Sequence, residues 1–561
     1  MFGNLPRWRP WTVAILCTYL ALSLTQHVST TSKGVLEPLY YSLDVVVIGW
    51  LFLWWVFKRP AYVHWLLLPV FLILPLELYL RLHFNTGLKA HHLGIIAETN
   101  PSEAIEFIGD QGWLWALIWC VVLLWWFLIL RAMRQTRALD CSGRLRFVVA
   151  LIALVGGSIL FYSDRLNSET IEKTRPFGLV ASAYQFWQER NNADDLMKLK
   201  QEFAFHAQSA TKDKRVIVLV IGESARADRW SLNGYERETN PLLAATDNLI
   251  SLTDVVSATS ATSLSVPVML SRLPAVDSFK SSSFKEKSIV SAFNESGFQS
   301  YWLSNQLSYG KYDSSVTAIA KEAKHVKFLN IVQATHRSSF DEVLLDPFKK
   351  ILSENAEQKF IVLHTLGSHW NYSYRHPQSF DRWQPSLFGA GHISPSVALK
   401  ERLNNSYDNS ILYTDWMLSN IIEILKSSAE VSAMIYISDH GQNLYDGACT
   451  LAFHGSNTQY DFQVPALVWY SEQFAQRYPE KIVSLRKHRE APLSVQNIFH
   501  SLADLGDIQI PGDTLRGSFF NETFSPQKRY VDSYGMSDYD NSTFDNTCRE
   551  VIDKGTPIPR Y

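Results

Sequence analysis

The chain has few cysteines and lacks a pair of them at metal-binding spacing. Its five cysteines are spread over 561 residues and never form a CxxC pair, so a metal site built on paired thiolates is not expected. Cys449 and Cys548 lie in the polar part of the chain. They could pair if that part is outside the cytoplasm, but the sequence does not fix the distance between them.

The chain also lacks an excess of charge of either sign. It has 52 lysines and arginines against 54 aspartates and glutamates, which gives a formal net charge of -2. Proteins that bind nucleic acids need a concentrated basic face. We therefore expect no nucleic-acid partner.

Long apolar stretches are confined to the first third of the chain. Hydrophobic residues make up 47% of the sequence, yet the mean hydropathy is close to zero. This combination indicates an apolar part and a polar part in series, and a chain of this length is expected to form at least two units. The apolar windows are residues 11–26, 40–57, 62–80, 113–130 and 147–162, and each is about long enough to cross a hydrocarbon core of roughly 30 Å.

Basic residues between these windows predict the orientation in a membrane. They gather on one side, at Arg7, Arg9, Lys58, Arg59, Arg131, Arg134, Arg137, Arg144 and Arg146. By the positive-inside rule that side faces the cytoplasm, and five spans then place the rest of the chain on the opposite side. We predict a five-span membrane domain over residues 1–163, interfacial linker helices over 164–213 and a soluble domain over 214–561.

Polar residues within the predicted membrane domain have two interpretations. The outer loop over 83–111 has apolar residues at helical spacing, with Asn100 and Glu103 among them. It could be an interfacial amphipathic helix with a solvated face, or a membrane-proximal wall of an active site that touches a lipid headgroup. Asp44 and Glu77 lie near the outer ends of apolar windows, and we expect both carboxylates to reach water.

The polar part alternates short apolar runs with helical segments. The run over 216–221 is β-branched and aliphatic and too short for a helix, which predicts a buried strand of a mostly parallel sheet. Further strands are predicted over 250–256, 298–303, 360–364, 433–438 and 466–469. Strands that alternate with helices predict an α/β/α sandwich with its active site at the carboxyl ends of the strands.

Candidate metal ligands follow several of these strands. Glu223 comes after the first strand, Asp439 and His440 follow a later one, and His369 and His454 lie in loops beyond strand ends. Carboxylate and imidazole ligands suit zinc or manganese rather than an iron–sulfur centre. Taken alone, Glu223 could cap the next segment or face solvent, and each histidine could be a hydrogen-bonded loop residue.

A cluster of hydroxyl residues, SATSATSLSVP over 257–267, stands before a predicted helix. Such a cluster usually supplies an N-cap, whose side-chain oxygen accepts a hydrogen bond from the first turn. Here it belongs to a domain whose strand ends also supply a glutamate, an aspartate and histidines. Together these groups favour a catalytic metal site over separate structural roles.

Longer motifs give the chain a resemblance to a known family. They are GESARADRWSLNGYERETNP (222–241), SLSVP (263–267), YWLSNQ (301–306), HTLGSHWNYSYRHP (364–377), NNSYDNSILYTD (404–415), SDHG (438–441) and, in the outer loop, AETNPSEA (97–104). With the five-span layout, they make nearly the whole chain resemble the membrane-bound phosphoethanolamine transferases of the alkaline phosphatase/sulfatase superfamily, which modify lipid A or the lipopolysaccharide core. The chain is most similar to the core-heptose branch and more distantly to the mobile colistin-resistance enzymes.

The resemblance implies a metal centre with a nucleophile. It places the protein ligands of one tightly bound Zn²⁺ at Glu223, Asp439 and His440, and the nucleophilic threonine, which completes the metal site, at Thr262. Gln442 departs from the family, since a glutamate commonly follows SDHG there. We expect this exchange to be tolerated.

The resemblance also implies contacts with the substrate. His369 and His454 are expected to bracket the transferred phosphate, and they could also hold part of a second metal. Asn100 and Glu103 match loop residues that the family places near the headgroup. Lys311 is a candidate substrate contact in a segment where the match to the family motif is out of register.

The function implied is transfer of phosphoethanolamine from phosphatidylethanolamine to a lipopolysaccharide acceptor, lipid A or a core sugar, through a phospho-threonine intermediate. The expected location is the bacterial inner membrane, as a multi-pass monomer with its catalytic domain in the periplasm. The alternatives are a phosphoglycerol transferase acting on a glucan or polymer, and a membrane-anchored phosphodiesterase or sulfatase-type hydrolase. A formylglycine sulfatase is disfavoured, because residues 265–269 lack the arginine of its signature.

Overall fold

The computed structural model describes residues 9–24, 36–57, 59–84, 88–90, 92–93, 96, 112–136, 143–163, 174–277, 285–308, 314–330, 339–390, 396–428, 430–531, 537–545 and 547–553. The chain divides into two compact units, Met1–Glu189 and Arg190–Tyr561. The division falls inside α10 (Phe177–Leu199), within the segment predicted as a linker. The boundaries at residues 163 and 213 remain predictions.

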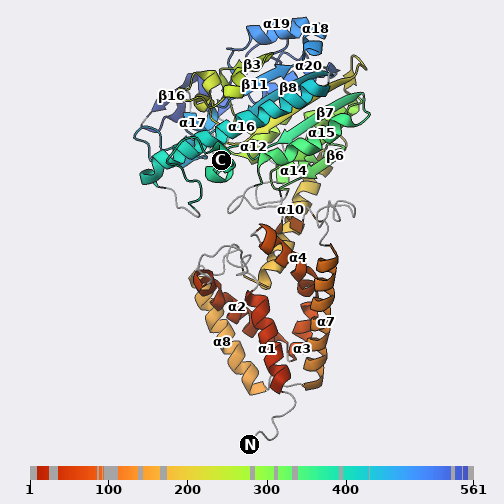
Figure 1. Ribbon diagram of the computed structural model, residues 1–561, viewed down its shortest axis with the longest axis vertical. Coiled ribbons are helices and arrows are strands. Elements are labelled where there is room, and N and C mark those ends of the chain that lie inside the picture. The colour runs from red at the N-terminus through yellow and green to blue at the C-terminus, as the bar shows by residue number, and fades with distance from the viewer. Residues whose placement is uncertain are drawn as a thin grey trace, which may run out of the picture. The chain divides into compact units, whose positions relative to one another are not determined.

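The first unit is helical in its described part (Figure 1). Its helices before α10 are α1 (Arg9–Leu24), α2 (Leu36–Val56), α3 (Pro60–Leu66), α4 (Leu68–Phe84), α7 (Gly112–Thr136) and α8 (Gly143–Tyr162). Each apolar window falls largely on these helices, and the third is divided between α3 and α4. Among the described residues, Trp113–Arg134 is long and apolar enough to cross a membrane, whereas Trp11–Ser23, Asp44–Val56 and Arg146–Tyr162 are shorter apolar stretches. The count of five spans therefore remains a prediction.

Small and polar groups join the helices of the first unit. Gly156 of α8 packs against Ile48 of α2 so closely that a Cβ on the glycine would lie 2.3 Å from the isoleucine Cδ1. Such small residues let helix backbones approach each other within a membrane. Between α3 and α7, the Trp126 indole donates to the His64 carbonyl at 3.0 Å, and His64 Nε2 lies 3.0 Å from the Trp126 carbonyl oxygen.

The prediction that Glu77 reaches water is wrong. Its side chain is buried and is held by Arg81 at 2.6 Å and by Arg175 at 3.1 Å. The Leu88 backbone N–H donates to its second oxygen at 2.6 Å. A buried carboxylate needs such partners, and here they tie the end of α4 to the segments that follow it.

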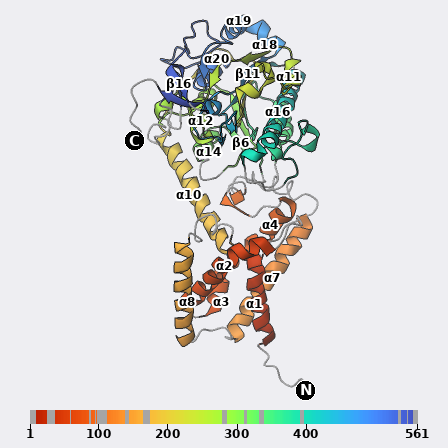
Figure 2. The ribbon, with the colours of Figure 1, turned by 90° about the vertical axis from the view of Figure 1, so that its left-hand side faces the viewer.

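A seven-stranded sheet forms the centre of the second unit (Figures 1 and 2). Its strands, in spatial order, are β3 (Leu249–Leu252), β11 (Ala466–Tyr470), β8 (Val431–Ser438), β2 (Arg215–Gly222), β7 (Gln358–His364), β5 (Gln299–Ser304) and β6 (His325–Phe328). Neighbours from β8 to β6 run parallel, and β11 runs antiparallel to both of its neighbours. The mostly parallel sheet is as predicted, whereas β6 was missed.

The predicted strand over 250–256 is divided in the structure. Its first part belongs to β3, and its last part forms β4 (Val255–Val256), which pairs with β12 (Leu493–Ser494) in a separate small sheet. The division has a physical cause, because Thr253 N donates to the Arg489 carbonyl at 3.0 Å instead of continuing the pairing with β11.

Alternate side chains of the central strand reach the two faces of the sheet. Ile217, Leu219 and Ile221 pack in one core with residues of α12 (Thr262–Leu270), α13 (Ile289–Glu295), α14 (Ser314–Ala320), α18 (Glu472–Arg477), α19 (Pro479–Lys487) and α20 (Asn497–Leu505). Val216, Val218 and Val220 pack in the other core with α11 (Pro241–Ala244), α15 (Leu345–Ser353) and α16 (Lys400–Ser428). With both faces covered, every residue of β2 is buried, which gives the predicted α/β/α sandwich.

The C-terminal segment supports a hairpin near the carboxyl end of the sheet. Cys449, between β9 (Asn443–Leu444) and β10 (Ala452–Phe453), forms a disulfide with Cys548, between β16 (Ser542–Asp545) and β17 (Glu550–Asp553). Backbone hydrogen bonds from Gln459 N to the Arg549 carbonyl and from Val551 N to the Asn457 carbonyl, both 2.9 Å, continue this contact to the start of α17 (Gln459–Phe462). The pairing that the sequence left open is therefore present.

Replacing Cys449 and Cys548 together by serine is expected to lower the free energy of unfolding by about 2–5 kcal/mol, because the disulfide closes a long loop. Chemical denaturation of the purified full chain, followed by tryptophan fluorescence, measures this change. The matched control replaces Cys17 and Cys120, which are exposed and unpaired. An equal loss in both double variants would contradict a stabilising role for the disulfide.

Candidate active site

Three neighbouring parallel strands bring the predicted site residues to one edge of the sheet. In the register of the sheet, Ile221 of β2 lies beside His364 of β7, and Gly222 lies beside Ser438 of β8. The residues that follow these strands therefore emerge together. They are Glu223 after β2, the segment to His369 after β7, and Asp439 with His440 after β8.

Glu223, Asp439 and His440 form a buried cluster. One potential ligand atom from each side chain lies within 4.8 Å of the others. His440 Nε2 is 3.4 Å from Glu223 Oε1 and 3.6 Å from Asp439 Oδ2. All three side chains are at most 1% exposed, so Glu223 does not face solvent.

The hydrogen bonds of this cluster leave ligand atoms available. Asp439 Oδ1 accepts from the backbone N–H groups of Ser224 and His440, whereas Asp439 Oδ2 is buried with no hydrogen-bond partner among the described residues. His440 Nδ1 donates to the Gly441 carbonyl at 2.8 Å, which leaves Nε2 as the ring nitrogen that faces Glu223 and Asp439. A buried oxygen without a partner beside a free imidazole nitrogen fits a divalent cation.

Without such a cation, the carboxylates of Glu223 and Asp439 repel each other. Burial and, to a lesser degree, the nearby Glu223 raise the pKa of Asp439 to about 6. Burial lowers the pKa of His440, but Asp439 and Glu223 outweigh that effect and raise it overall. A bound cation would relieve the repulsion between the two carboxylates.

Thr262 begins α12 and points its hydroxyl at this cluster. Its Oγ1 donates to Glu223 Oε2 at 3.1 Å and lies 3.5 Å from His440 Nε2. The N-cap of α12 is Ala261, with no side-chain hydrogen bond, so Thr262 does not act as the cap. The helix N-terminus also places partial positive charge near the hydroxyl, which favours negative charge on its oxygen.

Hydrogen bonds to neighbouring elements hold α12 in place. Pro267 lies inside the helix and cannot donate to the Ser263 carbonyl. That carbonyl instead accepts from the Ser315 hydroxyl of α14 at 2.7 Å. Ser265 donates to the Asp439 carbonyl at 2.6 Å, which links α12 directly to the loop after β8.

His369 and His454 lie close to the cluster but contribute no atom to it. The ring of His454 is centred 4.4 Å from that of His440, and its Nδ1 lies 2.7 Å from the Ser260 carbonyl oxygen. His369 Nδ1 lies 2.7 Å from the Trp370 carbonyl oxygen. Because carbonyl oxygens only accept, each ring carries its proton on Nδ1 and has a free Nε2.

Both histidines are neutral near pH 7. Burial lowers the pKa of His369 to about 4, with a further contribution from Arg375. Partial burial also lowers the pKa of His454 to about 4, with a contribution from His440, although the residue is still exposed to solvent.

The segment that carries His369 fits tightly against the end of β2. A Cβ on Gly367, whose φ is +46°, would lie 2.8 Å from the Glu223 carbonyl oxygen. Asp341 holds this segment by accepting from the backbone N–H groups of Leu366 at 2.7 Å and Gly367 at 2.9 Å. Arg375 Nε donates to the His369 carbonyl at 2.7 Å.

Sequence reasoning missed several of these positioning residues. Gln306 donates to Glu223 Oε2 at 3.1 Å and to the Thr365 carbonyl at 2.8 Å. Gln306 and Arg375 fall within motifs already recognised, so their proximity to the site could have been anticipated. Asp341 lies in no such motif, and only the folded chain brings it to the loop after β7. The predicted substrate residues Asn100, Glu103 and Lys311 lie outside the described residues.

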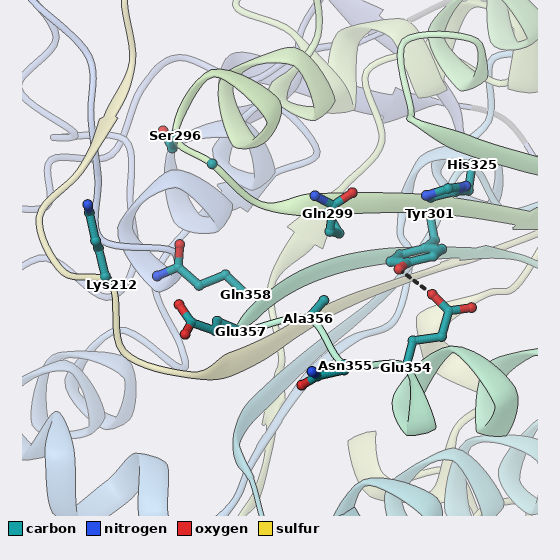
Figure 3. Close-up of a pocket in the computed structure, with 11 residues that line it drawn as sticks. Lys212, Ser296, Gln299, Tyr301, His325, Glu354, Asn355, Ala356, Glu357 and Gln358 are labelled. Atoms are coloured by element: carbon teal, nitrogen blue, oxygen red, sulfur yellow. Dashed lines mark hydrogen bonds between the residues drawn. The ribbon is translucent and has the colours of Figure 1, made fainter.

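A separate cavity of about 530 Å³ lies at the opposite edge of the sheet (Figure 3). Tyr301 lines it and donates to Glu354 at 2.6 Å, and Gln358 begins β7 beside it. It is thus formed near the amino ends of β5 and β7, whereas the site residues follow carboxyl ends. The cavity is distinct from the candidate active site.

The second unit matches a family of known proteins. The sequence model of the family described as Sulfatase covers residues 215–508. The chain belongs to the sulfatase family. Residues 45–190 match a second model, described as Phosphoethanolamine transferase EptA/EptB. The resemblance inferred from the motifs is therefore confirmed.

Several relatives of this sulfatase-family chain are phosphoethanolamine transferases. It is 28% identical over 440 residues to phosphoethanolamine transferase EptA of Escherichia coli K12, with 74% of this chain and 77% of the relative covered. It is 25% identical over 471 residues to EptC of the same organism, with 78% of each covered. It is also 28% identical over 316 residues to the Kdo(2)-lipid A phosphoethanolamine 7''-transferase of that organism, with 55% of this chain and 53% of the relative covered.

A solved structure supports the fold of the second unit. The crystal structure of the C-terminal periplasmic domain of Escherichia coli EptC, in complex with Zn, aligns with a TM-score of 0.54 at 24% identity. The alignment covers 62% of this chain and 94% of that one. This likeness establishes the alkaline phosphatase type of fold expected for a sulfatase-family domain.

Proposed function

We propose that this protein transfers phosphoethanolamine from phosphatidylethanolamine to a lipopolysaccharide acceptor, either lipid A or a core sugar, with Thr262 as the nucleophile. The names of its relatives support the transferred group. The observation that carries the proposal is the position of Thr262 Oγ1, 3.1 Å from Glu223 Oε2 and 3.5 Å from His440 Nε2. A hydroxyl held against a carboxylate–imidazole cluster is arranged for activation as a nucleophile.

Glu223, Asp439 and His440 would hold one zinc ion, as their proximity and the unpartnered Oδ2 of Asp439 among the described residues suggest. Zinc bound there would lower the pKa of the Thr262 hydroxyl. Glu223 then has two tasks, because its Oε2 also accepts the hydrogen bond that orients the threonine. The helix N-terminus of α12 stabilises the negative charge that develops on the threonine oxygen.

The transfer takes place in two displacements at phosphorus. The Thr262 oxygen attacks the phosphorus of the donor, and the bond from phosphorus to the diacylglycerol oxygen breaks. A hydroxyl or phosphate oxygen of the acceptor then attacks the same phosphorus and releases Thr262. A phospho-threonine is present between the two steps.

His369 and His454 move the protons. Each is neutral and has a free Nε2, so it can take the proton that Thr262 loses and pass it to the leaving diacylglycerol oxygen. In the second displacement the direction is reversed: the acceptor hydroxyl gives up a proton and Thr262 regains one. Their pKa of about 4 keeps both rings unprotonated near pH 7.

The apolar helices of the first unit would anchor the protein in a membrane. We infer that they hold the protein in the bacterial inner membrane, with the second unit in the periplasm, as the positive-inside pattern predicts. Donor and acceptor are both membrane lipids. Anchoring the site at the bilayer raises the effective concentration of both substrates.

The proposal is tested in cells that produce the full chain. Mass spectrometry of their lipopolysaccharide is expected to show a phosphoethanolamine mass increment with the wild-type protein and none with Thr262→Ala. Fragmentation of the modified species assigns the group to lipid A or to the core. Identical spectra from the two strains would overturn the proposed function.

Gln306 is expected to position Glu223 for metal binding. Gln306→Leu removes the donor to Glu223 Oε2 and should weaken zinc binding by about 10- to 100-fold, as is usual for residues that orient metal ligands. Competition with a fluorescent chelator on the purified full chain measures this affinity. The matched control is Gln442→Leu, whose amide donates to the Ser368 carbonyl and to no proposed ligand. Equal losses in the two variants would contradict the assignment.

A further inference from the structure

Two aromatic residues stand directly beside the two histidines of the site. Trp370 follows His369 in the chain, and Phe453 precedes His454. Although they come from segments far apart in sequence, their rings are in contact, with centroids 4.8 Å apart and planes inclined by 61°. The ring contact therefore joins the two loops that carry His369 and His454.

A contact with a buried neighbour holds the Trp370 ring in place. It makes an edge contact with the ring of Tyr372, with centroids 5.2 Å apart and planes at 85°, and Tyr372 is fully buried. Trp370 itself remains half-buried. Its carbonyl oxygen accepts from Arg375 and also lies against His369 Nδ1. The backbone of Trp370 therefore contacts the His369 side chain directly.

Phe453 is held in position by its backbone. Its φ of +68° lies in the left-handed region, which a bulky residue rarely adopts and which is retained mainly at functional sites. Pairing of β10 with β9 fixes this conformation, and Asn443 Nδ2 donates to the Phe453 carbonyl at 2.9 Å. The residue is half-buried, and its ring contacts that of Trp370.

The geometry of the pair leaves ring surface available to a ligand. Inclined rings cover less of each other's faces than parallel stacked rings do. An aromatic face is the negative pole of the ring, and it attracts cations such as ammonium groups, most strongly for tryptophan. A phosphoethanolamine group carries its ammonium two carbons away from the phosphate oxygen. A headgroup whose phosphate is bracketed by His369 and His454 carries its ammonium toward the two loops that hold these rings.

We propose that Trp370 and Phe453 bind the ammonium group of the donor headgroup and thereby select ethanolamine over a neutral alcohol such as glycerol. This inference rests on the proposed function and names the feature of the donor that the same site recognises. Neither ring supplies a proton or a metal ligand, so their effect is on binding of the headgroup and not on the chemistry at phosphorus.

The test compares two soluble headgroup probes on the purified, zinc-loaded full chain. O-phosphoethanolamine and glycerol 3-phosphate share the phosphate and differ in the ammonium group. Calorimetry is expected to show tighter binding of phosphoethanolamine to the wild type. Trp370→Leu should reduce this preference by about 5- to 30-fold, the range of cation–π contacts in partly desolvated sites. Trp370→Phe keeps an aromatic face and should retain most of the preference.

A second variant and a matched control separate recognition from structure. Phe453→Leu should reduce the preference less than Trp370→Leu. Trp383→Leu replaces another half-buried tryptophan, which lies against Arg237 and Arg382, and should leave the preference unchanged. In transfer assays, Trp370→Leu should raise KM for phosphatidylethanolamine with little change in kcat.

The outcomes distinguish this inference from the proposed function. The wild type could transfer phosphoethanolamine while Trp370→Leu shows the same preference for O-phosphoethanolamine over glycerol 3-phosphate as the wild type. In that case the ammonium site is wrong and the proposed function stands. A loss of affinity for both probes by the same factor in Trp370→Leu would also overturn it, because that is the result of a purely structural role. If the wild type transfers no phosphoethanolamine, the proposed function itself fails.

Discussion

Thr262→Ala is expected to reduce phosphoethanolamine transfer by the purified full chain by roughly 10⁴-fold or more, the scale seen when an enzyme loses its nucleophile. Two neighbouring hydroxyls in the described part of the chain are already engaged in hydrogen bonds. Ser265, on the same helix, donates to the Asp439 carbonyl, and Ser224 donates to Glu223 Oε1. The loss should appear in kcat, measured with labelled phosphatidylethanolamine and a lipid A acceptor in mixed micelles.

The matched control is Thr262→Ser, which keeps a hydroxyl at the start of α12. It should retain much more activity than the alanine variant, while both keep zinc content and thermal stability close to the wild type. Thr262→Ala that retains more than a tenth of wild-type kcat would show that another group attacks phosphorus.

His440→Ala is expected to remove both bound zinc and activity. The side chain offers the imidazole nitrogen of the cluster, 3.4 Å from Glu223 Oε1, and its loss would leave two carboxylates facing each other in a buried site. Elemental analysis of the full chain should give about one zinc per wild-type chain and far less in the variant. Extended dialysis against a chelator should inactivate the wild type reversibly.

The His454→Gln variant tests whether His454 carries a proton or binds a metal ion. The His454 ring lies 4.4 Å from that of His440 but is not part of the three-residue cluster. The variant should keep its zinc and lose transfer activity, because it cannot carry the proton. Two zinc ions in the wild type, with one lost in His454→Gln, would instead support the second metal that the sequence left open.

The position of the site could be predicted because it depends on strand ends. Once 216–221 and 433–438 are recognised as buried parallel strands, Glu223, Asp439 and His440 must emerge at one edge if the strands are neighbours. The structure makes them neighbours, as β2 and β8. Thr262 is harder to place, since it comes from a helix, and its assignment relied on the resemblance of the motif.

Other features could not be read from the sequence for physical reasons. The antiparallel direction of β11 depends on the path of the chain between strands, and periodicity does not record it. Glu77 has partners supplied by Arg81, one turn away, and by Arg175, far along the chain. Much of the motif over 222–241 also serves the fold: Arg226 pairs with Asp228 and Asp446, and Arg237 pairs with the buried Asp408.

The central claim is that Thr262, activated beside the Glu223–Asp439–His440 cluster, carries the phosphoethanolamine group between donor and acceptor. The most direct measurement is peptide mapping by mass spectrometry of the zinc-loaded full chain, incubated with phosphatidylethanolamine in the absence of acceptor. The account predicts a phosphoethanolamine adduct on Thr262 that is absent after zinc removal and disappears when acceptor is added. An adduct on a different residue, or transfer that proceeds with Thr262 never modified, would contradict it.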